Sequence, residues 1–133
     1  MRIRQLALCT ALLAASGVFE SARADSPPVY LLKWGSQGNG PGQFNFPLGV
    51  AVDGVGNVYV TDTQSKQIEK FDSNGNWLLA WGSPGSGPGQ FDIPLGIAVS
   101  AIGEVYVTDS SNGRVQVFNS SGGYVRAWGA PGR

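Results

Sequence analysis

An internal repeat with a period of 47 residues constrains the fold of this chain more than any other feature. Residues 34–80 align with residues 81–127 without a gap, and about half of the aligned positions are identical. Trp34 and Trp81 begin the two copies, and Trp128 begins a third. Short apolar runs separated by glycine-rich turns, repeated at this spacing, are typical of β-propellers, in which each unit is a four-stranded blade.

The first 24 residues have the pattern of an export signal. Two arginines precede an apolar stretch from Leu6 to Phe19, and Ala22-Arg23-Ala24 has the small-x-small pattern of a cleavage site. The apolar stretch is shorter than the roughly 20 residues of a membrane-spanning helix, so an uncleaved anchor is the less favoured alternative. We therefore predict that residues 1–24 are a signal peptide. The protein would be exported, either secreted or periplasmic, after cleavage near Ala24, and would have no membrane attachment afterwards.

Composition argues against several classes of site. The chain has no histidine, and its one cysteine, Cys9, lies in the predicted signal. Zinc sites are therefore not expected. The turns at 53–57 and 72–76 have too few carboxylates for calcium, which takes six to eight oxygen ligands, and we expect ordinary hairpins there. The sequence offers no evident general base or nucleophile, and the processed chain is slightly acidic. We predict no catalytic residue, no metal, no cofactor and no nucleic-acid partner.

Four strand signals separated by turn signals occur in each copy. Glycine and asparagine in these turns tolerate the positive φ of tight hairpins. The sequence predicts an all-β chain with two full four-stranded antiparallel blades. The predicted strands are 48–52, 58–61, 67–71 and 77–81 in the first copy, and 95–99, 105–108, 114–118 and 124–128 in the second.

The first strand of each copy alternates small and large residues. Gly49 and Ala51, like Gly96 and Ala98, lie on one face of their strand. Small residues on one face indicate the innermost strand, where neighbouring blades approach most closely. A further segment, Tyr30–Trp34, resembles the fourth strand of each copy, and it predicts one extra outer strand.

Three segments of the second copy resemble the NHL-repeat β-propellers: Pro94-Leu-Gly-Ile-Ala-Val99, Val105-Tyr-Val-Thr-Asp109 and Arg114-Val-Gln-Val-Phe118. The first copy matches at 47–53 and 56–62 but lacks the Asn and Arg of the following turn. WD and kelch repeats fit less well, because their signature residues are missing at the proper phase. The resemblance implies a first repeat at 32–75, a second at 79–122, and an outer strand with a truncated linker at 123–133. The fold would be a partial six-bladed propeller.

Two blades do not close a ring, and an open ring leaves sheet faces uncovered. Three interpretations remain open. The chain is a truncated product or gene fragment, which we favour; it is a short propeller that self-associates through its open blade faces; or it is a stable open arc.

Candidate binding residues lie on the face that carries the long glycine linkers, because longer loops more often carry function. The polar residues near strand ends on this linker face are Asp62, Asp109, Asn112 and Arg114. Each also has an ordinary structural explanation. The two aspartates are expected to accept backbone N–H bonds, Asn112-Gly113 is a favourable turn, and Asp109 is positioned to pair with Arg114. The binding site is therefore not defined by sequence.

The resemblance to NHL propellers implies a function in binding rather than in chemistry. We expect an exported binding or scaffold module that contacts protein or glycan surfaces and is not an enzyme. The alternative is a part of a metal-dependent lyase or lactonase-like propeller enzyme whose catalytic blades are absent from this chain.

Overall fold

The computed structural model describes residues 27–132, and all regular secondary structure in this range is β-strand. Every strand belongs to one compact unit that begins at Lys33, whereas residues up to Leu32 fall in a separate unit. The predicted signal peptide lies outside the described residues. A search of the described range found no helix of the length and apolarity needed to cross a membrane.

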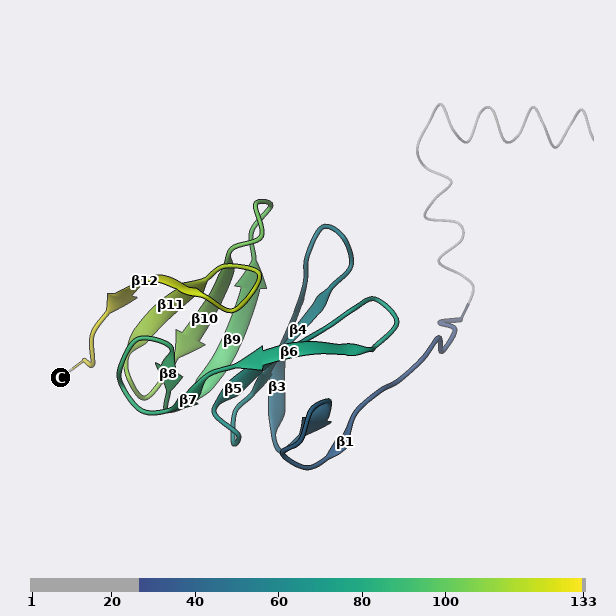
Figure 1. Cartoon of the computed structure of the whole chain (residues 1–133), viewed down its shortest axis with the longest axis horizontal. Coiled ribbons are helices and arrows are strands. Elements are labelled where there is room, and N and C mark those ends of the chain that lie inside the picture. Colours follow the sequence, from purple (N-terminus) through teal and green to yellow (C-terminus); the bar gives the residue numbers. More distant parts are fainter. Residues whose placement is uncertain (1–26, 133) are drawn as a thin grey trace, which may run out of the picture. The chain divides into compact units, whose positions relative to one another are not determined.

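Two four-stranded antiparallel sheets form the body of this unit (Figure 1). The first sheet, which we call the first blade, contains β3 (Pro47–Val52), β4 (Val58–Asp62), β5 (Gln67–Phe71) and β6 (Trp77–Trp81) in that spatial order. The second blade contains β9 (Pro94–Val99), β10 (Val105–Asp109), β11 (Arg114–Phe118) and β12 (Tyr124–Gly129). All eight predicted strands are confirmed, each within one residue of its predicted bounds, and the two sheets do not close into a ring.

Each glycine linker also contains a two-residue parallel pair that the sequence analysis did not predict. In the first linker β1 (Ser36–Gln37) pairs with β2 (Gln43–Phe44), and in the second β7 (Ser83–Pro84) pairs with β8 (Gln90–Phe91). A glutamine side chain organises each loop: Gln90 Oε1 accepts from the Gly87 amide at 2.9 Å. Gly85 has a φ of +149°, which L side chains rarely adopt, and a Cβ there would displace the same glutamine side chain, so this position favours glycine.

The extra outer strand predicted at Tyr30–Trp34 is wrong: residues 27–35 have no regular secondary structure. An outer strand needs a free third strand to pair with. In both described blades the fourth position is already taken, by β6 and β12. Trp34 instead packs on Phe71, with 5.8 Å between ring centroids, and lies against Gly75.

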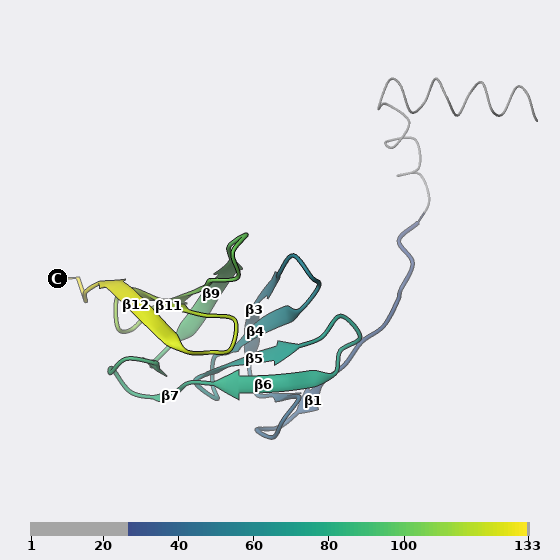
Figure 2. The ribbon, with the colours of Figure 1, turned by 45° about the horizontal axis from the view of Figure 1, so that its top comes forward.

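The hydrophobic core of the unit lies at the contact between the two blades. Its buried members are Tyr59 and Ile68 from the first blade, Phe91 from the second linker, and Val105, Val107 and Phe118 from the second blade, with Trp81, Ile97 and Val99 packed against them. The innermost strands β3 and β9 lie side by side at this contact (Figure 2). A Cβ at Gly49 would overlap the carbonyl oxygen of Leu95, which confirms the predicted reason for small residues on this face.

Candidate functional site

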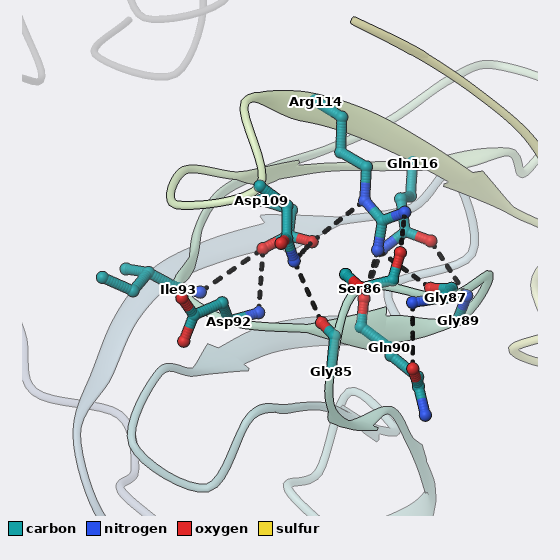
Figure 3. A network of polar contacts seen from close by, with 11 residues as sticks. Gly85, Ser86, Gly87, Gly89, Gln90, Asp92, Ile93, Asp109, Arg114 and Gln116 are labelled. Carbon is teal, nitrogen blue, oxygen red and sulfur yellow. Dashed lines mark hydrogen bonds and ion pairs between the residues drawn. The ribbon is translucent and has the colours of Figure 1, made fainter. Parts of the chain in front are cut away.

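A buried carboxylate, Asp109, ties the end of β10 to the second linker (Figure 3). Its Oδ1 accepts from the backbone amides of Asp92 at 3.0 Å and Ile93 at 3.3 Å. Its Oδ2 accepts from Asn112 Nδ2 at 2.8 Å and from Arg114 Nε at 3.1 Å. The sequence-predicted pair between Asp109 and Arg114 is therefore present, and the carboxylate also has the predicted backbone donors.

The two donor side chains of this cluster extend the contact along the linker. The Asn112 amide and the Arg114 guanidinium donate, at 2.7–3.0 Å, to the backbone carbonyls of Gly85, Ser86, Gly87 and Gln90. Bonds between a planar guanidinium and several fixed acceptors are strong and directional. Three of the four candidate residues thus come together, and their polar atoms hold the loop in place.

The fourth candidate, Asp62, occupies the equivalent position of the first blade, away from the other three. It is fully buried and accepts from the backbone amides of Asn45 at 3.0 Å and Phe46 at 2.7 Å. Ser65 and Gln67 stand where the second blade has Asn112 and Arg114. The first linker therefore lacks the arginine-centred contacts of the second.

A buried acid, Glu69, was not singled out by the sequence analysis. In the second blade its equivalent Gln116 accepts from the Gly89 amide at 2.9 Å and donates to the Gln90 carbonyl at 2.7 Å. Glu69 Oε2 accepts from the Gly42 amide at 3.0 Å, but its buried Oε1 has no partner. Burial raises the pKa of Glu69 above its usual value, against the opposing effect of the Gly42 bond. The difference between Glu69 and Gln116 at equivalent positions of the two repeats is the sequence feature that could have identified this acid.

The opposite end of the blades carries two equivalent turns, β3–β4 (residues 53–57) and β9–β10 (residues 100–104). Val55 and Ile102 stand at the same position of these turns, and each is 83% exposed. A pocket of about 260 Å³ lies between the turns, with Lys70 and Ser120 in its wall. We call this surface the turn face.

A lysine and a tyrosine support the floor of the turn face. Lys70 Nζ donates to the Ser120 carbonyl oxygen at 2.8 Å and lies 5.1 Å from the ring centroid of Tyr59. The Tyr59 hydroxyl donates to Asp53 Oδ2 at 3.2 Å. Burial, reinforced by the charge of Asp53 and this hydrogen bond, raises the pKa of Tyr59 to about 12, so the phenol remains a donor.

The aspartate-containing turns have the hairpin contacts expected of them. Asp53 Oδ1 accepts from the amides of Val55 at 3.0 Å and Asn57 at 2.9 Å. Asp72 accepts from Asn74 and Asn76 in the same manner, both at 2.9 Å. Over residues 27–132, no group of three or more His, Cys, Asp or Glu side chains is close enough together to hold a metal ion.

Comparison with known sequences identifies the repeat. The NHL repeat profile matches twice, at residues 44–71 and 91–118. A B-box type zinc finger protein, ncl-1, of Caenorhabditis elegans is 45% identical over 47 residues, which are 35% of this chain and 6% of that protein. NHL repeat-containing protein 3 of Mus musculus is 38% identical over 47 residues, or 34% of this chain and 14% of that protein. This chain thus spans a small part of the length of these curated relatives.

Solved structures share the arrangement of the blades. A Bacteroides fragilis protein described as exported has a TM-score of 0.63 and 15% identity, over 78% of this chain and 29% of that one. A streptogramin B lyase has a TM-score of 0.53 and 20% identity, over 65% of this chain and 27% of that one. At these identities the likeness is one of fold alone. The chain therefore contains two NHL-type repeats, each of which forms most of one propeller-type blade.

Proposed function

We propose that this chain is a binding module without chemistry of its own, and that a protein partner contacts it through the turn face. The observation that carries the proposal is the pair of apolar tips, Val55 and Ile102, exposed at equivalent positions on either side of one pocket. Single exposed apolar residues are ordinary on protein surfaces. Two that flank one hollow with both apolar and polar groups in its wall provide the apolar contacts and the central anchor position typical of a protein interface.

The size of the pocket favours a protein side chain over a small molecule. Ligand pockets usually enclose about 300–1,000 Å³. The hollow between the turns, of about 260 Å³, is smaller, and it has Asp53, Lys70 and Ser120 in its wall. A polar side chain of a partner can enter it while neighbouring apolar residues of that partner cover the two tips.

The linker face supports binding less well. The side chains of Asp109, Asn112 and Arg114 already bond to the chain's own backbone and to one another. A ligand that bonded to them would have to compete with these internal contacts, at a cost of about 1–3 kcal/mol for each buried group left unpaired. On the turn face, a partner can cover the exposed side chains of Val55 and Ile102 without breaking internal hydrogen bonds.

Export is part of the proposed function, because the pattern of residues 1–24 is that of a signal peptide. The Bacteroides fragilis protein with the same fold is described as exported. N-terminal sequencing of the protein recovered outside the cytoplasm of its source cells should begin at Asp25. A start at Met1 in that material would contradict cleavage at Ala24.

Site-specific photo-cross-linking in the source cells tests the binding face. A benzoyl-phenylalanine side chain is placed at Val55, at Ile102 or, as the control, at Ser111, which is exposed in the β10–β11 turn of the linker face. We expect the same cross-linked protein from Val55 and Ile102 and none from Ser111. Cross-links from Ser111 alone, or cross-links to glycan rather than protein at the two tips, would overturn the proposal.

A further inference from the structure

The two blades bury one sheet face each against the other, and each blade leaves its opposite face outward. Because the blades are repeats, the outward face of the second blade is equivalent to the buried face of the first, and the outward face of the first is equivalent to the buried face of the second. Inside that contact, Thr61 from the first blade and Pro94 from the second are buried. The residue 47 positions after Thr61 is Thr108, which is exposed on the second blade, and the one 47 positions before Pro94 is Pro47, which is exposed on the first. Each half of the internal interface therefore recurs, uncovered, at one end of the unit.

Residues on these outward sides define two named surfaces. The head face belongs to the first blade and contains the exposed residues Pro47, Leu48, Val50 and Val52, with Phe71 buried beneath Trp34 at its edge. The tail face belongs to the second blade and the turn after β10, and it contains the exposed residues Gly96, Thr108, Ser110 and Trp128 and the half-buried Tyr106. Leu48 is 54% exposed, Val50 65% and Trp128 50%. Apolar surface of this kind marks an interaction site.

We propose that the partner of these faces is a second copy of this chain, which docks its tail face on the head face and so repeats the internal blade contact between molecules. Such an interface is heterologous, because each copy contributes a different surface, and it produces a ring or a chain of copies. The geometry is already present once within the molecule, between β3 and β9.

The hydrogen-bonding groups of the internal contact have equivalents on the two outward faces. Thr61 Oγ1 donates to the Leu95 carbonyl at 2.9 Å, and Thr63 Oγ1 donates to the Pro94 carbonyl at 2.7 Å. On the tail face Thr108 and Ser110 supply the same hydroxyls. On the head face the carbonyls of Leu48 and Pro47 are the equivalent acceptors.

A glycine on the tail face would also allow the backbones of two copies to approach closely. Gly49 is required at the internal contact because a Cβ would overlap the Leu95 carbonyl. Gly96 is its equivalent on the tail face, where a Cβ would meet only the Thr108 side chain. Within one molecule only a side chain that can move lies near Gly96, whereas in the proposed contact between two copies this position would face backbone, as Gly49 does.

The charged part of the internal contact is not repeated. Lys66 Nζ pairs with Asp92 at 2.9 Å across the blades, whereas Gly113 and Asn45 stand at the equivalent positions of the outward faces. The contact between copies therefore lacks this ion pair and depends on apolar burial and hydroxyl bonds. We expect it to be weaker than the internal contact, reversible, and nearly insensitive to salt.

Trp34 competes with the incoming copy. Trp34 lies on Phe71 and Gly75 of the first blade. In the internal contact Trp81 lies in the same way on Phe118 and Gly122, with 5.7 Å between the Trp81 and Phe118 ring centroids. Trp128 of a second copy would need the place that Trp34 occupies. A groove of about 310 Å³ between Trp34 and the head face shows that this cover is partial. Replacing Trp34 should therefore strengthen association.

Sedimentation velocity of the full chain, processed as in its source, tests the proposal over a wide range of concentrations. Val50→Asp blocks the head face and Thr108→Asp blocks the tail face; both side chains are exposed in the single molecule, and the charge is buried only in the assembly. Ser121→Asp, in an exposed turn, is the matched control. We expect concentration-dependent association of the wild type and of the control, and monomers from each blocked variant alone.

Mixing the two blocked variants gives the sharpest result. Each retains one intact face, so the mixture should form 1:1 dimers and nothing larger. Trp34→Ser should associate at least several-fold more tightly than the wild type, and Gly96→Ala several-fold more weakly. Circular dichroism confirms that each variant is folded. Leu48→Asp on the head face replaces Val50→Asp, and Ser110→Asp on the tail face replaces Thr108→Asp, where the first variant is not folded.

Three results would overturn the proposal: a wild type that stays monomeric at every concentration, blocked variants that associate like the wild type, or a mixture that remains monomeric. Any of them would mean that these faces are covered by something other than a second copy, such as further blades. Val55→Ser alters the turn face only and should leave association unchanged, so the outcome is independent of the proposed binding function.

Discussion

Thr61 of the first blade donates its hydroxyl hydrogen to the carbonyl oxygen of Leu95 in the second, across 2.9 Å. The same Oγ1 accepts from the Gly49 amide at 2.8 Å. One buried hydroxyl therefore joins the inner strand of its own blade to the inner strand of the next. This bond is the polar counterpart of the apolar core between the blades.

Thr61→Val should destabilise the protein by about 1–3 kcal/mol, because it leaves the Gly49 amide and the Leu95 carbonyl without their partner in a buried contact. Urea unfolding of a dilute sample measures the change. Thr108→Val is the control: the equivalent hydroxyl is exposed, and its loss should cost less than about 0.5 kcal/mol. Equal losses for the two variants would contradict the assignment of Thr61 to the interface.

The inner-strand glycines should respond differently to the same substitution. Gly49→Ala places a methyl group against the Leu95 carbonyl and should cost about 1–3 kcal/mol through overpacking. Gly96→Ala meets only a side chain that can move, and it should be close to neutral or slightly stabilising. Thermal unfolding of dilute samples compares the two. A neutral Gly49→Ala would mean that β3 and β9 are further apart than described.

Glu69 should make stability depend on pH. Its folded pKa lies above the unfolded value of 4.5, so between these two values the folded state holds more protons than the unfolded state. The stabilising contribution of Glu69 to the free energy of unfolding is fully present below pH 4.5 and is lost as the pH rises through the folded pKa. Glu69→Gln should remove this loss and raise stability at neutral pH by about 1–2 kcal/mol, because the amide can donate as Gln116 does.

The reciprocal variant provides the control for this effect. Gln116→Glu should introduce the same loss of stability with rising pH into the second blade, since it replaces the donor that bonds to the Gln90 carbonyl. Chemical unfolding at a series of pH values measures both variants. A Glu69→Gln protein with the pH profile of the wild type would show that the fold does not raise the pKa of the Glu69 carboxyl.

Arg114 should matter far more than its equivalent Gln67. Arg114→Ala leaves the buried Asp109 carboxylate without its cation and frees the linker carbonyls, at a cost of about 3–5 kcal/mol. Gln67→Ala removes no such contact and should cost less than about 1 kcal/mol. Hydrogen exchange of the Gly87 and Gly89 amides reports the expected local loosening of the second linker. Unchanged protection in Arg114→Ala would contradict the proposed role.

The eight blade strands could be predicted because their signals are local. Alternating apolar residues and glycine turns fix both the period and the hairpins, as in β10 and β11. The segment Tyr30–Trp34 has the same local pattern, yet it is not a strand, because pairing depends on a distant partner that local pattern does not reveal. The parallel pairs of the linkers were missed for the same reason: they depend on how Gln43 and Gln90 fold back on their own loops.

The site was less accessible to prediction than the fold. The Asp109–Arg114 pair follows from a spacing of five residues across one turn and could be anticipated. The turn face could not, because it brings Lys70 to Ser120 over 50 positions of sequence, and only the packing of two blades places them together.

The contact between Trp81 and Phe118 tests the central claim most directly, since it exists only if two equivalent blades pack face to face. The ring centroids are 5.7 Å apart, so a nuclear Overhauser spectrum of the labelled chain should contain cross-peaks between the indole and the phenyl ring. Chemical shifts should also mark β-strand over both 47–81 and 94–129. Assigned, sharp resonances of both rings with no cross-peak between them would contradict the account.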